Sequence, residues 1–367
     1  MRRIALLIIF VFSAALAVGQ ESAQKPSPQP DPEFDLPRVD VTFSLLKADT
    51  PLPLPSTVMD GPPVCSSSGV AFLQFWTPPP TYNNKEVFSI TAAGKVAELP
   101  VSRVTGLSNA MIRSFDPGST MAAMLLSAIP HPAAGSGSFG QKHHWDYYLA
   151  RFKYNGEFNG YTALDLGFEP GQIAQLNDDT YIVIGTDQIN SKPVVALINN
   201  SGTVLRRLDT DEVVPSEEGL NEMMRATSFV GLKPQDLPPS MKMSVALSRF
   251  QFVHFGTKVL LLEPGPHTRI VEISPGGQAR VVSVKLPEGQ VGDSLLASRS
   301  SWMIRTYPEG KDGLSNLYEV DRETGSIVRQ LRTPGVPATS IACSSEDGLF
   351  GIRWLERKPY LMVADKQ

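Results

Sequence analysis

Five stretches of the chain share one pattern of apolar and polar positions: a short apolar strand, a turn that contains glycine, and a second strand. The strands are rich in Val, Ile, Leu and aromatic residues, which is typical of β-hairpins. A unit that recurs every few tens of residues cannot bury its own apolar face, so its copies must stack. The stretches are residues 87–100, 147–158, 194–208, 269–282 and 317–331, with turn glycines Gly94, Gly156, Gly202, Gly277 and Gly325.

A second pair of short apolar runs, broken by a small polar turn, lies upstream of each hairpin, and one more pair lies near the C-terminus. These pairs are residues 64–65 with 70–75, 110–112 with 121–126, 173–176 with 180–184, 252–255 with 259–262, 295–297 with 302–304, and 340–343 with 349–352. Two inner and two outer strands make a four-stranded antiparallel sheet. The pattern therefore predicts six such sheets, the last one incomplete.

The sixth copy has a third strand at residues 360–364 and then the sequence ends at Gln367. An unassigned strand-like run, residues 39–46, precedes the first copy. Pairing the two would remove both open sheet edges and close a ring. We therefore expect an all-β, six-bladed β-propeller of four-stranded antiparallel blades, closed by an N-terminal strand that joins the last blade.

With this architecture the chain resembles the six-bladed β-propellers, in the loose company of TolB-like, NHL-repeat and gluconolactonase-like rings. The resemblance covers roughly residues 39–366. It is architectural: residues 344–348 and 115–118 only approach the Ser-Pro-Asp-Gly turn of TolB-like blades. It implies a fold and assigns no family chemistry to individual residues.

The N-terminus has the features of a targeting segment. Arg2 and Arg3 precede an apolar run at residues 4–18, and small residues follow at the cleavage position, which predicts a signal peptide over residues 1–19. A retained anchor is the alternative, although the run is short for a bilayer span. Residues 20–38 carry five prolines and predict a disordered tether before the propeller domain at 39–367. We expect a periplasmic or secreted protein, with no stable membrane insertion once the signal is cleaved.

Charge and composition disfavour several partners. The formal net charge is −4 and 19% of residues are charged, with no dense run of Lys and Arg, so we expect no nucleic-acid partner. No further apolar segment is long enough to span a membrane. We expect a monomer without a cofactor.

Two insertions interrupt the even spacing of the copies: residues 128–146 and residues 212–243, the second with a predicted short helix at 216–229. Long loops on a rigid ring are where binding residues usually lie. The first insertion holds the densest polar and aromatic cluster, His143, His144, Trp145 and Asp146. Adjacent residues of an extended segment point to opposite sides, so these histidines do not readily share one ion. We expect no metal site.

Other polar groups fit structural roles better than chemical ones. Residues 177–179 have the composition of a turn, and the acidic residues at 209–222 fit solvated loop and helix-start positions. No Gly-x-Ser-x-Gly elbow is present, and no histidine is placed by sequence to activate a serine. We therefore assign no catalytic residue.

The best candidates for ligand binding are the polar residues of the innermost strands, which line the channel of a propeller. They are Arg113, Gln175, His254 and Arg299. The two arginines could clamp an anion, because guanidinium presents paired donors to a carboxylate or phosphate. The alternative is that these side chains bond only to channel water and neighbouring carbonyls.

The two cysteines, Cys65 and Cys343, each precede a pair of serines and so occupy the same position in their copies. Blades one and six are neighbours in a closed ring, which places the thiols near each other. An oxidising compartment allows a disulfide, while two buried free thiols are the alternative.

Together these features favour an exported, non-enzymatic binding module that holds a partner protein or small ligand, of unknown identity, on its loop face or in its central funnel. The alternative is a lactonase- or lyase-type propeller enzyme with a metal in the funnel, which rests on analogy with other six-bladed rings.

Overall fold

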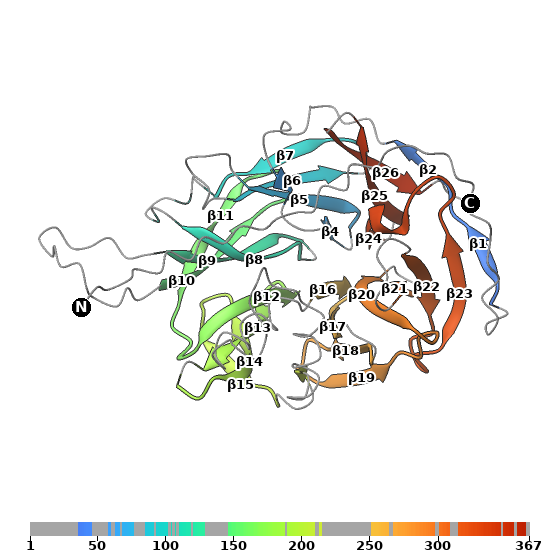
Figure 1. Ribbon diagram of the computed structural model, residues 1–367. Coiled ribbons are helices and arrows are strands. Elements are labelled where there is room, and N and C mark those ends of the chain that lie inside the picture. The colour runs from blue at the N-terminus through green and yellow to red at the C-terminus, as the bar shows by residue number, and fades with distance from the viewer. Residues whose placement is uncertain are drawn as a thin grey trace, which may run out of the picture. The chain divides into compact units, whose positions relative to one another are not determined.

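The computed structural model describes residues 36–45, 58–59, 63–66, 68–76, 85–91, 93–101, 104, 107, 110–118, 120–128, 146–187, 189–209, 213–214, 251–263, 267–297, 301–308, 315–345, 348–355 and 358–364. They form six β-sheets set as blades around a common centre (Figure 1). Consecutive strands within each blade pair antiparallel, so the expected all-β, six-bladed propeller is confirmed.

From the centre outward, blade one contains β4 (Val64–Cys65) and β3 (Val58–Met59), then β5 (Val70–Trp76), β6 (Lys85–Thr91) and β7 (Val96–Leu99). Blade two contains β8 (Met111–Asp116), β9 (Ala122–Ala128), β10 (Asp146–Phe152) and β11 (Phe158–Leu164). Blade three contains β12 (Glu169–Asn177), β13 (Thr180–Asp187), β14 (Lys192–Asn199) and β15 (Val204–Arg207).

Blade four contains β16 (Gln251–Phe255), β17 (Lys258–Glu263), β18 (Arg269–Ile273) and β19 (Ala279–Ser283). Blade five contains β20 (Gln290–Ala297), β21 (Trp302–Pro308), β22 (Asn316–Val320) and β23 (Ile327–Arg332), with β1 (Arg38–Asp40) outside them. Blade six contains β24 (Ile341–Ser345), β25 (Gly348–Leu355), β26 (Lys358–Ala364) and β2 (Phe43–Leu45), and a 3₁₀ turn, η3 (Ala338–Ser340), precedes it.

The hydrophobic core is divided among the six boundaries between neighbouring blades. Each of six clusters of buried apolar residues takes its members from two adjacent blades. Phe72 and Phe152, for example, share the cluster between blades one and two. Cys343 and Leu73 share the cluster between blades six and one. Because that last boundary is packed like the others, the stacking predicted from the repeats closes into a ring.

The N-terminal segment closes the ring, although not as one continuous strand. Phe43 pairs with Ala364 and Leu45 with Met362, so β2 supplies the missing outer strand of blade six, as expected. β1 instead runs parallel to β23 and extends blade five. The expected single strand at residues 39–46 is therefore two short strands on two blades. The backbone of Val41, between them, still donates to the carbonyl of Arg332 at 2.8 Å.

A disulfide joins Cys65 of β4 to Cys343 of β24, with the two Cα atoms 5.5 Å apart. The sequence separation is 278 residues, so the bond fastens blade one to blade six directly. The equivalent repeat positions of the two cysteines thus place them together as predicted.

The turn glycines have two structural tasks. Gly325 has φ +69° and Gly156 has φ +86°, a left-handed backbone that favours glycine. In addition, a Cβ at Gly325 would overlap the backbone oxygen of Ser283 in blade four, and one at Gly156 would overlap that of Glu98 in blade one. The outer turns of blades two and five therefore pack closely on the outer strand of the preceding blade.

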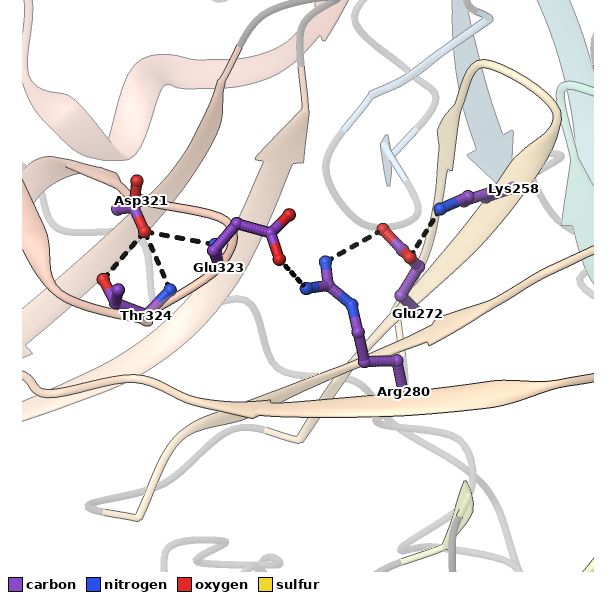
Figure 2. Close-up of polar contacts among 6 residues, drawn as sticks. All are labelled: Lys258, Glu272, Arg280, Asp321, Glu323 and Thr324. Carbon is purple, nitrogen blue, oxygen red and sulfur yellow. Dashed lines mark hydrogen bonds and ion pairs between the residues drawn. The ribbon is translucent and has the colours of Figure 1, made fainter.

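Blades four and five are also linked by charged side chains (Figure 2). Glu272 of β18 accepts from Lys258 at 2.7 Å and contacts Arg280 at 3.4 Å. Arg280 reaches across to Glu323 in the β22–β23 turn at 2.7 Å. Asp321 fixes that turn by accepting from the backbone of Glu323 and from Thr324. The network makes one continuous polar contact between the two blades.

Antiparallel pairing gives the ring two distinct faces. The first and third strands of each blade begin at one face, which we name the loop face, and the short turns within each strand pair lie at the other, the turn face. Both predicted insertions leave from the loop face, because they connect β9 to β10 and β15 to β16. The helix predicted at 216–229 lies outside the described residues. Among the described residues, no helix has the length and apolar character needed to cross a membrane.

Candidate functional site at the centre of the ring

A β-bulge recurs in the innermost strands, which border the centre of the ring. The register between first and second strands shifts by one residue in four blades. The extra residues are Arg113 in β8, Gly171 in β12, Asp293 in β20 and Ala342 in β24. A bulge re-aims a side chain out of the sheet, and Arg113, Gly171 and Asp293 are all exposed. The bulges therefore present one cationic and one anionic side chain at the centre.

Arg113 belongs to a polar group at the loop-face end of blades two and three. Its Nε donates to Oγ of the fully buried Ser127 at 2.7 Å, which fixes the base of the guanidinium. Beside it, the hydroxyl of Tyr147 donates to Glu169 Oε1 at 3.0 Å. We name Arg113, Ser127, Tyr147 and Glu169 the mouth cluster. Burial and the carboxylate of Glu169 raise the pKa of Tyr147, while the charge of Arg113 opposes that rise.

The mouth cluster also marks the base of an insertion. Ser127 is next to the last residue of β9 and Tyr147 is the second residue of β10, so the connection at residues 129–145 leaves and returns beside Arg113. Long connections on a rigid scaffold are frequent places for binding residues. The cluster therefore places a positioned cation beside the two ends of a long connection.

Asp293 holds the corresponding position in blade five, opposite blade two in the ring. Arg305 of β21 donates to it through Nε at 3.0 Å and Nη2 at 3.0 Å. Arg305 also donates to the backbone oxygen of Ile341 in blade six at 3.3 Å. The charge of Asp293 is thus balanced within its own blade.

A second polar group lies at the turn-face end of the innermost strands and is buried. Oδ1 of Asp116 is 2.7 Å from Nε2 of His254, so the contact joins blade two to blade four. Oδ2 of Asp116 accepts from the backbone N–H of Gln175 at 2.8 Å and of Gly118 at 3.1 Å. One carboxylate therefore ties together the inner strands of three successive blades.

The four predicted channel residues thus have different surroundings. Arg113 is exposed in the mouth cluster. Gln175 and His254 are 1% and 6% exposed and adjoin Asp116, so they lie in a buried polar network. Arg299 lies outside the described residues. The sequence analysis did not identify Asp116, Ser127, Tyr147, Glu169 and Asp293. Asp116 could have been found, because it is a polar residue just before an inner turn, as Gln175 and His254 are.

The residues considered as metal ligands also differ in their surroundings, and some lie outside the described residues. His143 and His144 lie outside the described residues, while Asp146 begins β10. At residues 177–179, Asn177 accepts from the backbone N–H of Asp179, and Asp179 accepts from Asn200, which are turn contacts. Within the described part of the chain, no group of three His, Cys, Asp or Glu side chains is placed to hold a metal ion.

Comparison with known proteins finds no family model and no curated protein that matches this chain. Solved structures do match. The β-propeller domain of the trilobed protease from Pyrococcus furiosus aligns at TM-score 0.40 and 6% identity, over 85% of this chain and 82% of that one. Acylaminoacyl peptidase from Pyrococcus horikoshii gives 0.40 and 10%, over 84% of this chain and 51% of that one. Trypanosoma rangeli sialidase gives 0.41 and 9%, over 83% and 53%. This chain thus spans about half the length of the last two proteins.

Proposed function

We propose that this protein is an exported, non-enzymatic binding module that holds a small anionic ligand at the loop-face mouth of its central channel. The observation that carries the proposal is Arg113, an exposed arginine set by a bulge at the centre of the ring and oriented through its Nε by a buried serine. Guanidinium presents paired donors that match carboxylate and phosphate groups.

The neighbours of Arg113 support a role in binding. Tyr147 and Glu169 bond to each other, so they form a fixed wall beside the guanidinium. The connection at residues 129–145 starts and ends at this wall. A fixed cation beside a long connection suits the capture of a small ligand, because little side-chain freedom is lost on binding.

Export is part of the proposal. It rests on the charged start and apolar run within residues 1–19, and the Cys65–Cys343 disulfide suits an oxidising compartment. The intact mass of the protein recovered from a secreting host tests it. We expect a mature chain that begins at Gln20, and an uncleaved chain would contradict export by this route.

Calorimetric titration of the mature protein tests the binding function. The probes are inorganic phosphate, citrate and galacturonate, and we expect one of them to bind with a stoichiometry of one. Arg113→Gln should weaken that binding about tenfold or more, the usual scale for a charged hydrogen bond. Arg206→Gln, at an exposed arginine of β15, is the matched control and should bind as the unaltered protein does.

Two outcomes would overturn this assignment. Equal affinity of the Arg113→Gln and Arg206→Gln proteins would show that the ligand does not bind at the mouth cluster. Absence of binding heat with all three anions would contradict the proposal that the ligand is anionic. Heat that continues after saturation would reveal turnover and favour the enzymatic alternative.

A further inference from the structure

A row of aromatic side chains lies on one face of the outer strands of blade two, away from the channel. Tyr148 of β10 and Tyr161 of β11 have ring centroids 5.7 Å apart and planes at 82°. Phe158 stacks on Tyr161 with centroids 6.4 Å apart, and Phe152 is 5.3 Å from Phe158. We name Tyr148, Phe158 and Tyr161 the aromatic corner.

Strand register shows that the corner lies on a single face. Tyr161 pairs with Ala150 and Tyr148 pairs with Ala163, so all four positions alternate onto the same side of the sheet. The inner end of the row is packed, because Phe152 is fully buried in the core between blades one and two. The outer end is accessible, because Tyr161 is 39% exposed.

A carboxylate stands beside the corner. Asp146 is two residues before Tyr148 in β10 and therefore lies on the same face. Burial, the charge of Asp146 and the proximity of Tyr161 all raise the pKa of Tyr148. Among the described residues, the carboxylate of Asp146 and the hydroxyl groups of Tyr148 and Tyr161 make no hydrogen bond or ion pair.

These features together suit the binding of a cation. The face of an aromatic ring is electron-rich and attracts a cation, and rings set at right angles offer two such surfaces at once. A nearby carboxylate adds attraction without demanding a hydrogen bond. A quaternary ammonium group is cationic and has no N–H to donate, so its attraction to the ring faces and to the carboxylate does not depend on hydrogen-bond geometry.

We propose that the aromatic corner, together with Asp146, is a binding site for a trimethylammonium group. The site is separate from the mouth cluster, because Tyr147 lies on the opposite face of β10, at the boundary with blade three, where it bonds to Glu169 of β12. Its ligand is a small molecule or modified side chain that carries this group.

Two probes of the same shape test the proposal on the mature protein. Choline and 3,3-dimethyl-1-butanol differ only in a charged nitrogen or a neutral carbon at the branching atom. Ligand-observed NMR titration should show saturable binding of choline, at least about fivefold tighter than the alcohol, which corresponds to about 1 kcal/mol of cation–π attraction. Equal binding of the two probes would overturn the proposal.

Variants then locate the site. Tyr161→Ala should weaken choline about fivefold or more, while Tyr161→Phe keeps the ring and should bind as the unaltered protein does. Leu205→Ala, at a 55% exposed apolar position on β15, is the control for loss of surface area and should leave choline binding unchanged. Asp146→Asn alters only charge, so it reports on the site even if a ring deletion fails to fold. Unchanged choline affinity in both Tyr161→Ala and Asp146→Asn would contradict the assignment.

Two further binding experiments identify which kind of molecule carries the trimethylammonium group. Phosphatidylcholine vesicles and a peptide with trimethyl-lysine present it on a lipid surface and on a protein. Competition of either with free choline supports the same site, and binding of vesicles that free choline does not displace would contradict it.

Discussion

His254 Nε2 lies 2.7 Å from Asp116 Oδ1, although the residues are 138 positions apart and belong to blades two and four. The two side chains are 3% and 1% exposed. The contact passes the end of β12, whose Gln175 N–H also donates to Asp116. A buried carboxylate that serves three blades fixes their relative positions, because its donors have no solvent to bond to instead.

Replacement of Asp116 should therefore be costly. In Asp116→Ala the N–H groups of Gln175 and Gly118 and the ring of His254 lose their acceptor, and each buried group without a partner costs about 1–3 kcal/mol. We expect urea unfolding to show a loss of about 3 kcal/mol or more, and a smaller loss for Asp116→Asn, which keeps one oxygen. Asp165→Ala, at an exposed position, should stay within about 0.5 kcal/mol of the unaltered protein. Similar losses in Asp116→Ala and Asp165→Ala would contradict the role of the carboxylate.

The disulfide should stabilise the closed ring. Bonds across long loops usually contribute about 2–4 kcal/mol, and Cys65 and Cys343 are 278 residues apart. We expect the double substitution Cys65→Ser, Cys343→Ser to lose about that much in denaturant unfolding and to become insensitive to reductant. Thiol titration of the unfolded, unreduced protein should find no free thiol. Two free thiols per chain would show that the bond does not form in the isolated protein.

N-terminal truncation separates the tether from the closing strands. Within the described part of the segment, which starts at residue 36, backbone hydrogen bonds to the blades begin at Pro37, whose carbonyl accepts from Gln330 at 3.0 Å. Deletion of residues 20–36 should leave thermal melting nearly unchanged. Deletion of residues 20–45 removes β1 and β2, exposes the edges of β23 and β26, and should cause aggregation or a large fall in Tm. Light scattering and melting curves compare the two, and equal behaviour would refute closure by this segment.

Local patterns predicted most of the fold, because hairpins depend on neighbours in sequence. Gly277 and Gly325, for instance, identified outer turns that the structure contains. The matching positions of Cys65 and Cys343 even predicted a contact across the ring. What the pattern could not show was the division of residues 39–46 between two blades, since both edges accept a short strand.

The candidate site was less predictable, because its geometry depends on register and distant partners. Arg113 was identified by its type and strand, but its exposure depends on a bulge that only the pairing with β9 reveals. We expected His254 to line the channel, but it is buried and bonds to Asp116. The sequence pattern assigned Asp116 to a turn, so this partner was not predicted. The carboxylate of Glu169 meets Tyr147 only after blades two and three have stacked.

The charged network between blades four and five, which is centred on Glu272 and Arg280, should make the stability of the protein depend on pH. Burial alone would raise the pKa of Glu272, but the hydrogen bond from Lys258 and the charge of Arg280 outweigh it, so the pKa is lowered. A lowered folded-state pKa contributes stability above the unfolded value of about 4.3, and that stability is lost as pH falls through the folded value. Glu272→Gln should therefore cost about 1–2 kcal/mol at neutral pH and almost nothing near pH 3.

The control for this network is Glu323→Gln. Glu323 is 78% exposed, so its contact with Arg280 is solvated and should contribute less than about 0.5 kcal/mol. Urea unfolding at several pH values compares the two variants. A Glu272→Gln penalty that persists unchanged at pH 3 would show that the carboxylate charge is not its source.

Close packing of the outer turns gives a test that uses two glycines of the same conformation. Gly325 and Gly335 have φ of +69° and +74°, so alanine at either carries a similar backbone penalty of about 1–2 kcal/mol. Only Gly325 faces a neighbour: a Cβ there would overlap the oxygen of Ser283, whereas nothing lies within 4 Å of one at Gly335. We expect Gly325→Ala to lose about 1–3 kcal/mol more than Gly335→Ala, the usual scale of overpacking. Denaturant unfolding of the two variants measures the difference, and equal losses would mean that the turn does not need glycine for its approach to blade four.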